Sequence, residues 1–200
     1  METPATISPA ALDQIFLSAR THGAWLDRPV DTATLHRLYE LTRMGPTSAN
    51  GSPGRFVFVT SAAAKERLRP TLMPANVDKT MAAPVTVIAA YDTNFHEQMG
   101  KLFPARPGMG AHIGGMPAEL REGMAMQSGV LEAGYLILAA RSLGLDCGPM
   151  GGFDKSKVDA AFFEGQSWKS ALLINLGYGD TTKLFPRLPR LDFEETCRIE

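Results

Sequence analysis

Apolar residues recur at helical spacing in six parts of the chain. Most of these parts begin at a residue type that caps helices and end at glycine or proline, which indicates helices with defined ends. The helix over 119–143 is apolar almost all round, which predicts burial at the centre of the chain or in a subunit interface. The first predicted helix is capped by Ser8 and ends near residues 20–23, and the second is capped by Asp31 and ends at Gly45-Pro46. A third, over 62–68, is capped by Ser61 and closed by Pro70, and a turn or two follow over 76–81. The last two are a helix over 119–143, ended by Gly144, and one capped by Asp154.

Three apolar stretches, 55–60, 84–91 and 170–177, have the length and composition of strands. The second is apolar almost without interruption, which predicts a central strand covered on both faces. Between 92 and 117 the periodicity is lost and glycine, proline and methionine accumulate, which predicts a structureless, mobile cover over an active site. Because helices and strands do not alternate regularly and no repeat or linker interrupts the chain, we expect one α+β domain over residues 1–200.

The composition limits the partners that the chain can bind. Its 20 basic and 21 acidic residues leave a net charge of -1, which favours neither nucleic acid nor a membrane and leaves a small molecule as the expected partner. The apolar runs are too short to cross a bilayer and the first residues do not resemble a secretory signal, so we expect a cytoplasmic protein. The two cysteines, Cys147 and Cys197, have no histidine at ligand spacing, so we expect neither a metal site nor a disulfide.

Several common catalytic motifs are missing. The sequence holds no G-x-S-x-G, no G-x-x-x-x-G-K-[ST] and no H-E-x-x-H. The nearest match to a dinucleotide fingerprint, Gly108-Met109-Gly110, follows no predicted strand and lacks the third glycine. What remains is a set of polar, basic and glycine residues in loops around an apolar helical scaffold, at 20–22, 45–54, 76–79, 148–154 and 183–190.

The order and spacing of these segments over nearly all 200 residues resemble the nitroreductase family of flavoproteins. From Arg20-Thr21-His22 to the C-terminal Arg-Leu-Pro-Arg-Leu-Asp-Phe-Glu-Glu, the chain looks closest to the malonic semialdehyde reductases of pyrimidine degradation. The resemblance implies a nitroreductase-like α+β fold, in which helices flank a central, mostly antiparallel sheet and a long helix is buried. It also implies a homodimer that binds FMN at the subunit interface.

The resemblance assigns contacts to the phosphate and ribityl parts of FMN. A phosphate needs fixed cations, and Arg20 and Arg187 match the family's phosphate pair, with Lys183 able to assist. Small polar side chains suit the ribityl hydroxyls, and the loop that supplies some of them in the family usually reaches the FMN of the other subunit. The residues at these positions are Thr21, His22, which stands where serine is common, Thr47, Ser48 and Asn50.

The flavin ring requires a cation and an amide near N1 and O2, where negative charge develops on reduction. Lys79 and Asn76 match these family positions. The segment that supplies a backbone N–H to N5 is matched by Pro149, Met150, Gly151 and Gly152, with Gly151 where many relatives carry glutamate. Each set also has an ordinary explanation: solvated surface charges, an exposed lysine with its helix-capping asparagine, and glycines that turn a corner after a helix.

The function implied by the resemblance is a ping-pong oxidoreductase. NADH or NADPH passes a hydride to FMN and leaves, and a small electrophile is then reduced. In the subfamily the electrophile is malonic semialdehyde and the product is 3-hydroxypropionate. No catalytic residue is identified, although Arg106 and Arg121 border the predicted cover and could bind the substrate carboxylate. The alternatives are a general reductase of nitroaromatics, quinones or enones, and a flavin-binding protein without turnover.

Overall fold

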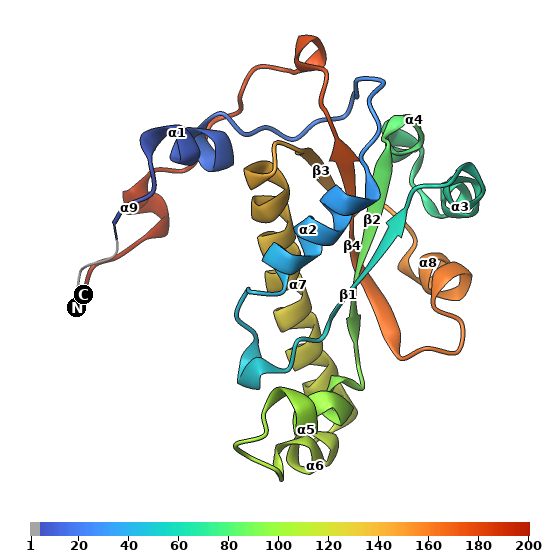
Figure 1. Cartoon of the computed structure of the whole chain (residues 1–200), viewed down its shortest axis with the longest axis vertical. Coiled ribbons are helices and arrows are strands. Elements are labelled where there is room, and N and C mark those ends of the chain that lie inside the picture. The colour runs from blue at the N-terminus through green and yellow to red at the C-terminus, as the bar shows by residue number, and fades with distance from the viewer. Residues whose placement is uncertain (1–4) are drawn as a thin grey trace.

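The computed structural model describes residues 5–200 and is organised around a four-stranded antiparallel sheet (Figure 1). The strands lie in the order β1-β2-β4-β3, so β2 and β4 are central. Their bounds are β1 Gly54–Val59, β2 Val85–Asp92, β3 Asp146–Met150 and β4 Trp168–Gly177. The three strands predicted from the sequence are confirmed. The fourth strand, β3, corrects the prediction that the segment after the long helix is a loop.

Helices cover both faces of the sheet. On one face α7 (Ala118–Ser142) and α2 (Thr32–Thr42) lie against it, and on the other lie α3 (Ala62–Leu68) and α8 (Lys155–Phe162), with α4 (Pro74–Ala82) near one end (Figure 1). Successive side chains of a strand point to opposite faces, and accordingly Val87 joins the cluster with α7 while Ile88 joins the cluster with α3 and α8. This two-sided burial explains why β2 is almost entirely apolar.

Side-chain hydrogen bonds cap the first turns of three predicted helices, α2, α3 and α8. The side chain of Asp31 accepts from the backbone N–H of Thr34 at 2.6 Å, that of Ser61 from Ala64 at 3.2 Å, and that of Asp154 from Lys157 at 3.1 Å. Each bond satisfies a backbone donor that the first turn of a helix leaves without a partner. Gly144, with a φ of +77°, follows α7 in the left-handed conformation that favours glycine.

The long helix α7 buries mostly small and polar residues, together with Leu136, and exposes several large apolar ones. Its buried positions include Ala125, Ser128, Glu132 and Ala133. Met126, Val130, Leu131 and Tyr135 are instead 36–46% exposed. The sequence predicts that this helix is buried at the centre of the chain or in a subunit interface. Contacts within one chain bury only one side of α7.

The segment between β2 and α7 is not structureless, which corrects the prediction for 92–117. It contains a 3-10 turn, η4 (Phe95–Gln98), and two short helices, α5 (Met99–Leu102) and α6 (Met109–Gly114). Phe95, Met99 and Ile113 are at most 2% exposed and form a separate small core with Ala125 of α7. The segment is thus held by its own apolar contacts, which no simple periodicity in the sequence indicates.

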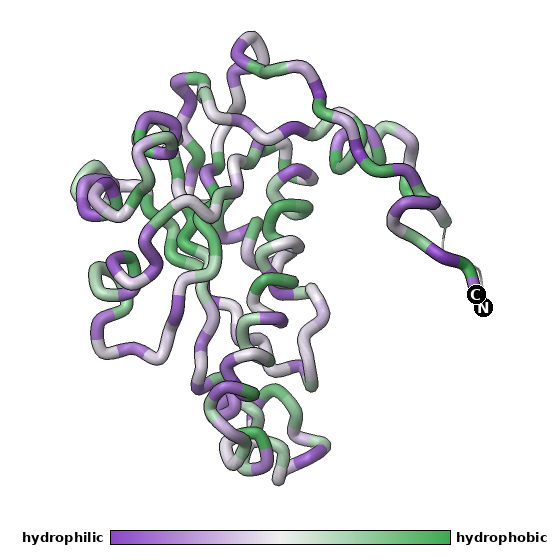
Figure 2. The backbone as a smooth tube through the Cα atoms, turned by 180° about the vertical axis from the view of Figure 1, so that it is seen from behind, coloured by the Kyte–Doolittle hydropathy of each residue, from purple (hydrophilic) through white to green (hydrophobic). Residues whose placement is uncertain are grey.

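Both ends of the described chain leave the main body and lie beside each other (Figures 1 and 2). The first is α1 (Pro9–Leu12), continued by a π-helical turn over Asp13–Leu17, so this helix ends a few residues earlier than predicted. The second is the segment 184–200, which contains α9 (Phe193–Thr196). We call these two segments the arms. They expose large apolar side chains, namely Phe16, Leu17, Phe185, Leu188, Leu191 and Ile199.

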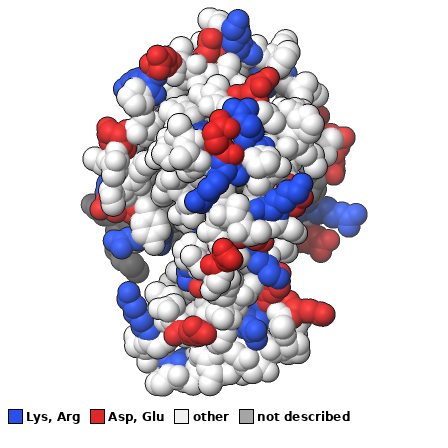
Figure 3. Space-filling view, turned by 90° about the vertical axis from the view of Figure 1, so that its right-hand side faces the viewer, with Lys and Arg blue, Asp and Glu red and all other residues white. Residues whose placement is uncertain are grey.

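Three further 3-10 turns complete the described elements: η2 (Ser48–Asn50), η3 (Arg69–Thr71) and η5 (Thr181–Lys183). On the face that carries α3 and α8, acidic and basic side chains are interspersed (Figure 3). Ion pairs there include Arg69 with Glu66 and Lys157 with Asp154. Within residues 5–200, no helix has both the length and the apolar character that spanning a bilayer demands.

Candidate functional site

Four arginines surround a small cavity where the arms meet the main body. The cavity has a volume of about 230 Å³ and is lined by Ala19, Arg20, Thr21, Arg141, Arg187, Leu188 and Arg190. Among residues 5–200 no carboxylate lines it. A site with several guanidinium groups and no acidic side chain suits a multiply charged anion such as a phosphate ester. The structure therefore brings together Arg20 and Arg187, the two arginines predicted to hold a phosphate.

The arginines also hold the arms in place. Arg20 Nη2 donates to the carbonyl oxygen of Phe185 at 2.5 Å, and Arg187 Nη2 donates to those of Leu17 and Ala19 at 2.6 and 3.1 Å. Arg141, at the end of α7, donates from Nη1 to the carbonyl oxygen of Ile15 at 3.1 Å. Because a guanidinium has five N–H donors, these bonds orient the side chains and leave donors for a ligand.

A second cavity, of about 390 Å³, adjoins the first, since Arg20 and Thr21 line both. Its other lining residues are Gly23, Ala24, Lys183, Leu184 and Phe185. Lys183 therefore lies near the arginine cavity, as predicted. A Cβ placed on Gly23 would lie 3.8 Å from Cδ of Lys79, so the Lys79 side chain runs past the edge of this second cavity.

The backbone of residues 21–22 runs along β3. Thr21 forms a parallel bridge with Cys147, and the His22 N–H donates to the carbonyl oxygen of Cys147 at 3.0 Å. A side chain at Gly148 would collide with the His22 carbonyl oxygen, so glycine is required for this close approach. The His22 ring itself is 4% exposed and faces Asp146, with 3.4 Å between Nε2 and Oδ1. The structure thus places the His22 side chain inside the protein, away from both cavities.

Of the predicted ring-binding residues, Asn76 and the segment 149–152 meet at the end of β3. Pro149 and Met150 are its last residues, and the exposed Gly151 and the half-buried Gly152 follow. The Asn76 amide donates from Nδ2 to the carbonyl oxygen of Gly152 at 2.7 Å, and a Cβ on Gly152 would collide with that amide. A Cβ on Gly151 would meet no atom of the described chain within 4 Å. Asn76 and the glycines therefore form one surface with free space above Gly151.

The loop that carries Thr47, Ser48 and Asn50 lies elsewhere. The Ser48 N–H donates to Ser128 Oγ of α7 at 3.2 Å, and the Asn50 amide donates from Nδ2 to the carbonyl oxygen of Leu102 at 2.8 Å. An α-helix rises 1.5 Å per residue, so Ser128 lies about 20 Å along α7 from Arg141 at the arginine cavity. Within one chain the structure therefore does not bring this loop to the arginine cavity.

This loop is held in a strained conformation. Ala49, Asn50 and Ser52 have positive φ values of 51°, 56° and 40°, which cost free energy in residues with a side chain. Thr47 Oγ1 accepts from the Ser52 N–H at 3.1 Å, and Oε2 of Glu132 accepts from the Gly54 N–H at 2.7 Å. The Glu132 side chain is buried, and burial raises its pKa, while the bond from Gly54 and the nearby Arg55 oppose that shift.

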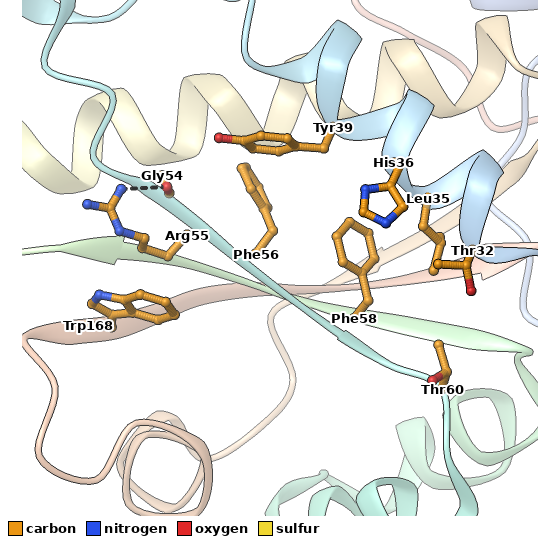
Figure 4. Close-up of a pocket in the computed structure, with 10 residues that line it drawn as sticks. All are labelled: Thr32, Leu35, His36, Tyr39, Gly54, Arg55, Phe56, Phe58, Thr60 and Trp168. Carbon is orange, nitrogen blue, oxygen red and sulfur yellow. Dashed lines mark hydrogen bonds between the residues drawn. The ribbon is translucent and has the colours of Figure 1, made fainter. Parts of the chain in front are cut away.

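A further cavity, of about 630 Å³, lies between α2 and β1. Figure 4 shows Tyr39 and His36 of α2 on the side of this cavity opposite Phe56 and Phe58 of β1. Among residues 5–200, those that line this cavity include none of the predicted FMN contacts. Its mainly apolar walls suit an apolar partner rather than a phosphate ester.

The sequence profile of the family described as "Nitroreductase family" matches residues 18–178. The chain belongs to the nitroreductase family. A family relative from Burkholderia lata is 58% identical over 195 residues, covering 98% of this chain and 99% of the relative. One from Ralstonia nicotianae is 56% identical over 194 residues, covering 97% and 98%. Both are provisionally named NADH dehydrogenase/NAD(P)H nitroreductase.

Solved structures with nitroreductase names share the fold. One from Bacillus subtilis, provisionally a nitroreductase, has a TM-score of 0.86 and 17% identity, covering 96% of this chain and all of its own. Another from Exiguobacterium sibiricum, provisionally a nitroreductase in complex with FMN, has a TM-score of 0.86 and 19% identity, covering 99% and 100%. The predicted nitroreductase-like fold is thereby confirmed.

Four residues of this nitroreductase-family site were not among the predicted contacts. Arg141 and Arg190 line the arginine cavity, and Ser128 and Glu132 hold the loop 47–54. Arg190 lies in the tail segment that resembles the family, which is a signal for it in the sequence. Arg141, Ser128 and Glu132 lie in a long, mainly apolar helix, and only the packing of α7 shows what they contact.

Proposed function

We propose that this chain is an FMN-dependent NAD(P)H oxidoreductase. The observation that carries the proposal is the arrangement of the arginine cavity, the adjoining second cavity with Lys79 at its edge, and Asn76, which lies one helical turn before Lys79 on α4 and bonds Gly152. It offers cations for a phosphate at one end and a polar platform for a flat heterocycle at the other. The provisional NAD(P)H nitroreductase names of the close relatives support the reductant, and the FMN in a structure of the same fold supports the cofactor.

The residue types in this arrangement fit FMN. Arg20, Arg187 and Arg141 would hold the phosphate, because each already has its guanidinium oriented by a backbone carbonyl. Asn76 uses one amide N–H on Gly152, and its second N–H and its oxygen are available to a ring. The space above Gly151 would admit the ring close to the backbone. Bound FMN supplies hydride transfer, accepting from NAD(P)H and giving to the acceptor.

Lys79 would stabilise the negative charge that reduction places on the ring. Its backbone is held on two sides, since its carbonyl oxygen accepts from Trp25 Nε1 at 3.0 Å and from Asn175 Nδ2 at 3.2 Å. These bonds fix the point at which the side chain leaves α4, and an ammonium held near the ring would stabilise the developing anion.

The complete site is proposed to need two copies of the chain. The loop with Thr47, Ser48 and Asn50 lies about 20 Å along α7 from the arginine cavity, too far to serve the same flavin in one chain. The outward apolar residues of α7 and the apolar arms supply a surface that a second copy would cover. A homodimer with FMN at the interface satisfies both observations.

The acceptor is proposed to be malonic semialdehyde, reduced to 3-hydroxypropionate. Support for this finer assignment comes from the resemblance of the 20–22 and 187–195 segments, whereas the names of the relatives favour a nitro compound. Arg121 is engaged in the fold, donating to the carbonyl oxygens of Thr93, Gly114 and Met116 at 3.2–3.3 Å. Of the two arginines considered for the substrate carboxylate, Arg106 is exposed and is the better candidate.

The test is steady-state NAD(P)H oxidation by the FMN-loaded protein with malonic semialdehyde, a nitroaromatic and a quinone as separate acceptors. Higher kcat/KM for the semialdehyde supports the finer assignment. Turnover of the nitroaromatic and quinone alone would overturn it and leave the oxidoreductase proposal standing. If FMN binds but no acceptor sustains turnover, the protein binds flavin without being a reductase.

A further inference from the structure

A network of buried polar side chains lies beneath α4, outside the cavities described above. Lys65, Thr80, Thr86 and Asn175 are each at most 5% exposed. Lys65 Nζ donates to the carbonyl oxygens of Thr80 and Ala83 at 2.7 and 2.8 Å and to Thr86 Oγ1 at 2.8 Å. Thr86 Oγ1 donates in turn to Asn175 Oδ1 at 2.7 Å. The three bonds of Lys65 use all three N–H groups of an ammonium ion.

The network ends on the residues of α4 and β3 that are proposed to meet the flavin. Asn175 donates from Nδ2 to the carbonyl oxygen of Lys79 at 3.2 Å and to Thr80 Oγ1 at 3.4 Å. Thr80 Oγ1 contacts Met150 Sδ at 3.5 Å. One turn earlier on α4, Asn76 is bonded to Gly152. The network thus joins α3 and the central strands β2 and β4 to the underside of the ring-binding residues.

The network also caps the C-terminal end of α4. No glycine follows α4: its C-cap is Ala83 in an extended conformation, so its last carbonyl groups need side-chain donors. Lys65 places its positive charge there, which the helix dipole favours.

Burying a lysine has a free-energy cost. Burial lowers the pKa of Lys65 to about 8, because an ammonium loses its hydration inside the protein. Replacing buried charged groups by well-packed apolar ones is often neutral or stabilising, whereas the three bonds of Lys65 join α3 to the end of α4 and to β2 in one geometry.

We propose that Lys65, Thr86 and Asn175 are positioning residues, which fix α4 so that Lys79 and Asn76 lie against the flavin ring and favour its reduced form. The proposal rests on the proposed function, since it concerns the same FMN site. None of the three residues lines the arginine cavity or the second cavity, and all three are at most 5% exposed, so they would act through α4 and not by contact with the flavin.

The test uses three variants and two measurements. Lys65→Met keeps an unbranched apolar side chain, one heavy atom shorter than lysine, and removes the three N–H donors. Thr86→Val keeps the shape and removes the hydroxyl, and Thr86→Ser restores the hydroxyl as the matched control. The first measurement is hydrogen exchange of the α4 amides in protein without FMN. The second is the two-electron midpoint potential of bound FMN.

We expect α4 amide exchange at least tenfold faster in Lys65→Met and Thr86→Val, with exchange in β1 unchanged. We also expect reduced FMN to bind about tenfold more weakly relative to oxidised FMN, a fall in midpoint potential of about 30 mV. Thr86→Ser should behave as wild type in both. Lower stability with an unchanged midpoint potential would overturn the positioning role, and so would unchanged α4 exchange. A protein that binds no FMN would overturn the proposed function, while the exchange measurement would still test whether the network holds α4.

Discussion

Single residues around the arginine cavity have two tasks, to hold the arms and to offer donors to an anion. Arg20 and Arg187 each bond a backbone carbonyl and each line the cavity. Loss of either arginine should lower the affinity for an anionic ligand, because a hydrogen bond to a charged group contributes about 1.5–3 kcal/mol.

We predict that Arg20→Gln and Arg187→Gln each weaken FMN binding by about 10- to 100-fold, because each removes a charge-assisted bond to the phosphate. The measurement is fluorescence titration with FMN, repeated with riboflavin, which lacks the phosphate and should bind all variants alike. Arg69→Gln in η3, which removes an exposed ion pair with Glu66 of α3, is the matched control. Undiminished FMN affinity in both cavity variants would contradict the phosphate assignment.

A second prediction concerns pH and Glu132. Burial raises the folded-state pKa of Glu132, so the folded protein binds this proton more readily than the unfolded chain does. The contribution of Glu132 to stability is therefore largest below the unfolded pKa, about 4.5, and is lost as the pH rises through the folded value. Glu132→Gln keeps an acceptor for the Gly54 N–H but does not titrate. We expect this variant to gain stability relative to wild type as the pH is raised across that window. Urea unfolding of both proteins between pH 4.5 and 8 checks it, and a pH-independent difference would show the account to be wrong.

At the scale of elements, the packing of α4 against the end of β3 determines which substitutions are tolerated. A Cβ on Gly152 would collide with the Asn76 amide, whereas one on Gly151 would meet open space.

We therefore predict that Gly152→Ala lowers the free energy of unfolding by about 1–3 kcal/mol, the usual cost of overpacking. Gly151→Ala serves as its control and should stay within about 0.5 kcal/mol of wild type. Chemical denaturation without FMN measures both. Equal stability of the two variants would mean that Asn76 can move aside and that α4 is not held against the glycines.

The elements that could be predicted from the sequence are those with local signals. Asp31, Ser61 and Asp154 cap their helices as predicted, and the apolar run over 84–91 is a strand covered on both faces. β3 was missed because Asp146-Cys-Gly-Pro-Met is short, shows no alternation and contains both glycine and proline. The helices within 92–117 were missed because they depend on packing with α7, through residues such as Phe95 and Ile113.

The same division applies to the site. Arg20, Thr21, Arg187 and Lys183 could be assigned because the order of their segments resembles a family, and the structure places them together. The His22 ring, in contrast, faces Asp146, since the backbone of residues 21–22 pairs with β3 and directs the side chain inward. The contacts of Ser128 and Glu132 depend on which side of α7 faces the sheet, which a helix apolar on most sides does not reveal.

At the scale of the whole molecule, the apolar side of α7 and the two arms remain uncovered in one chain. Val130 and Leu131 are 44% and 46% exposed, and the arms expose Phe185 and Leu188. We propose that a second copy covers these residues and contributes its loop 47–54 to the site.

We predict that Val130→Glu, which buries a charge in the proposed interface, converts the dimer to a monomer and lowers FMN affinity at least tenfold. Sedimentation analysis with and without FMN measures the first effect and fluorescence titration the second. Ser156→Glu, an exposed residue on α8, is the control and should leave both unchanged. A Val130→Glu monomer that binds FMN as tightly as wild type would contradict a site shared between subunits.

The proposed function requires that this chain bind FMN and that the bound FMN exchange hydride with NAD(P)H. The most direct measurement is the absorbance of the purified, desalted and FMN-supplemented protein during anaerobic titration with NADH or NADPH. We expect a protein-bound flavin spectrum that is lost on addition of one equivalent of reductant per flavin and returns on addition of an acceptor. A protein that retains no FMN after desalting and reconstitution, or whose bound FMN keeps its absorbance with either nicotinamide, would contradict the proposed function.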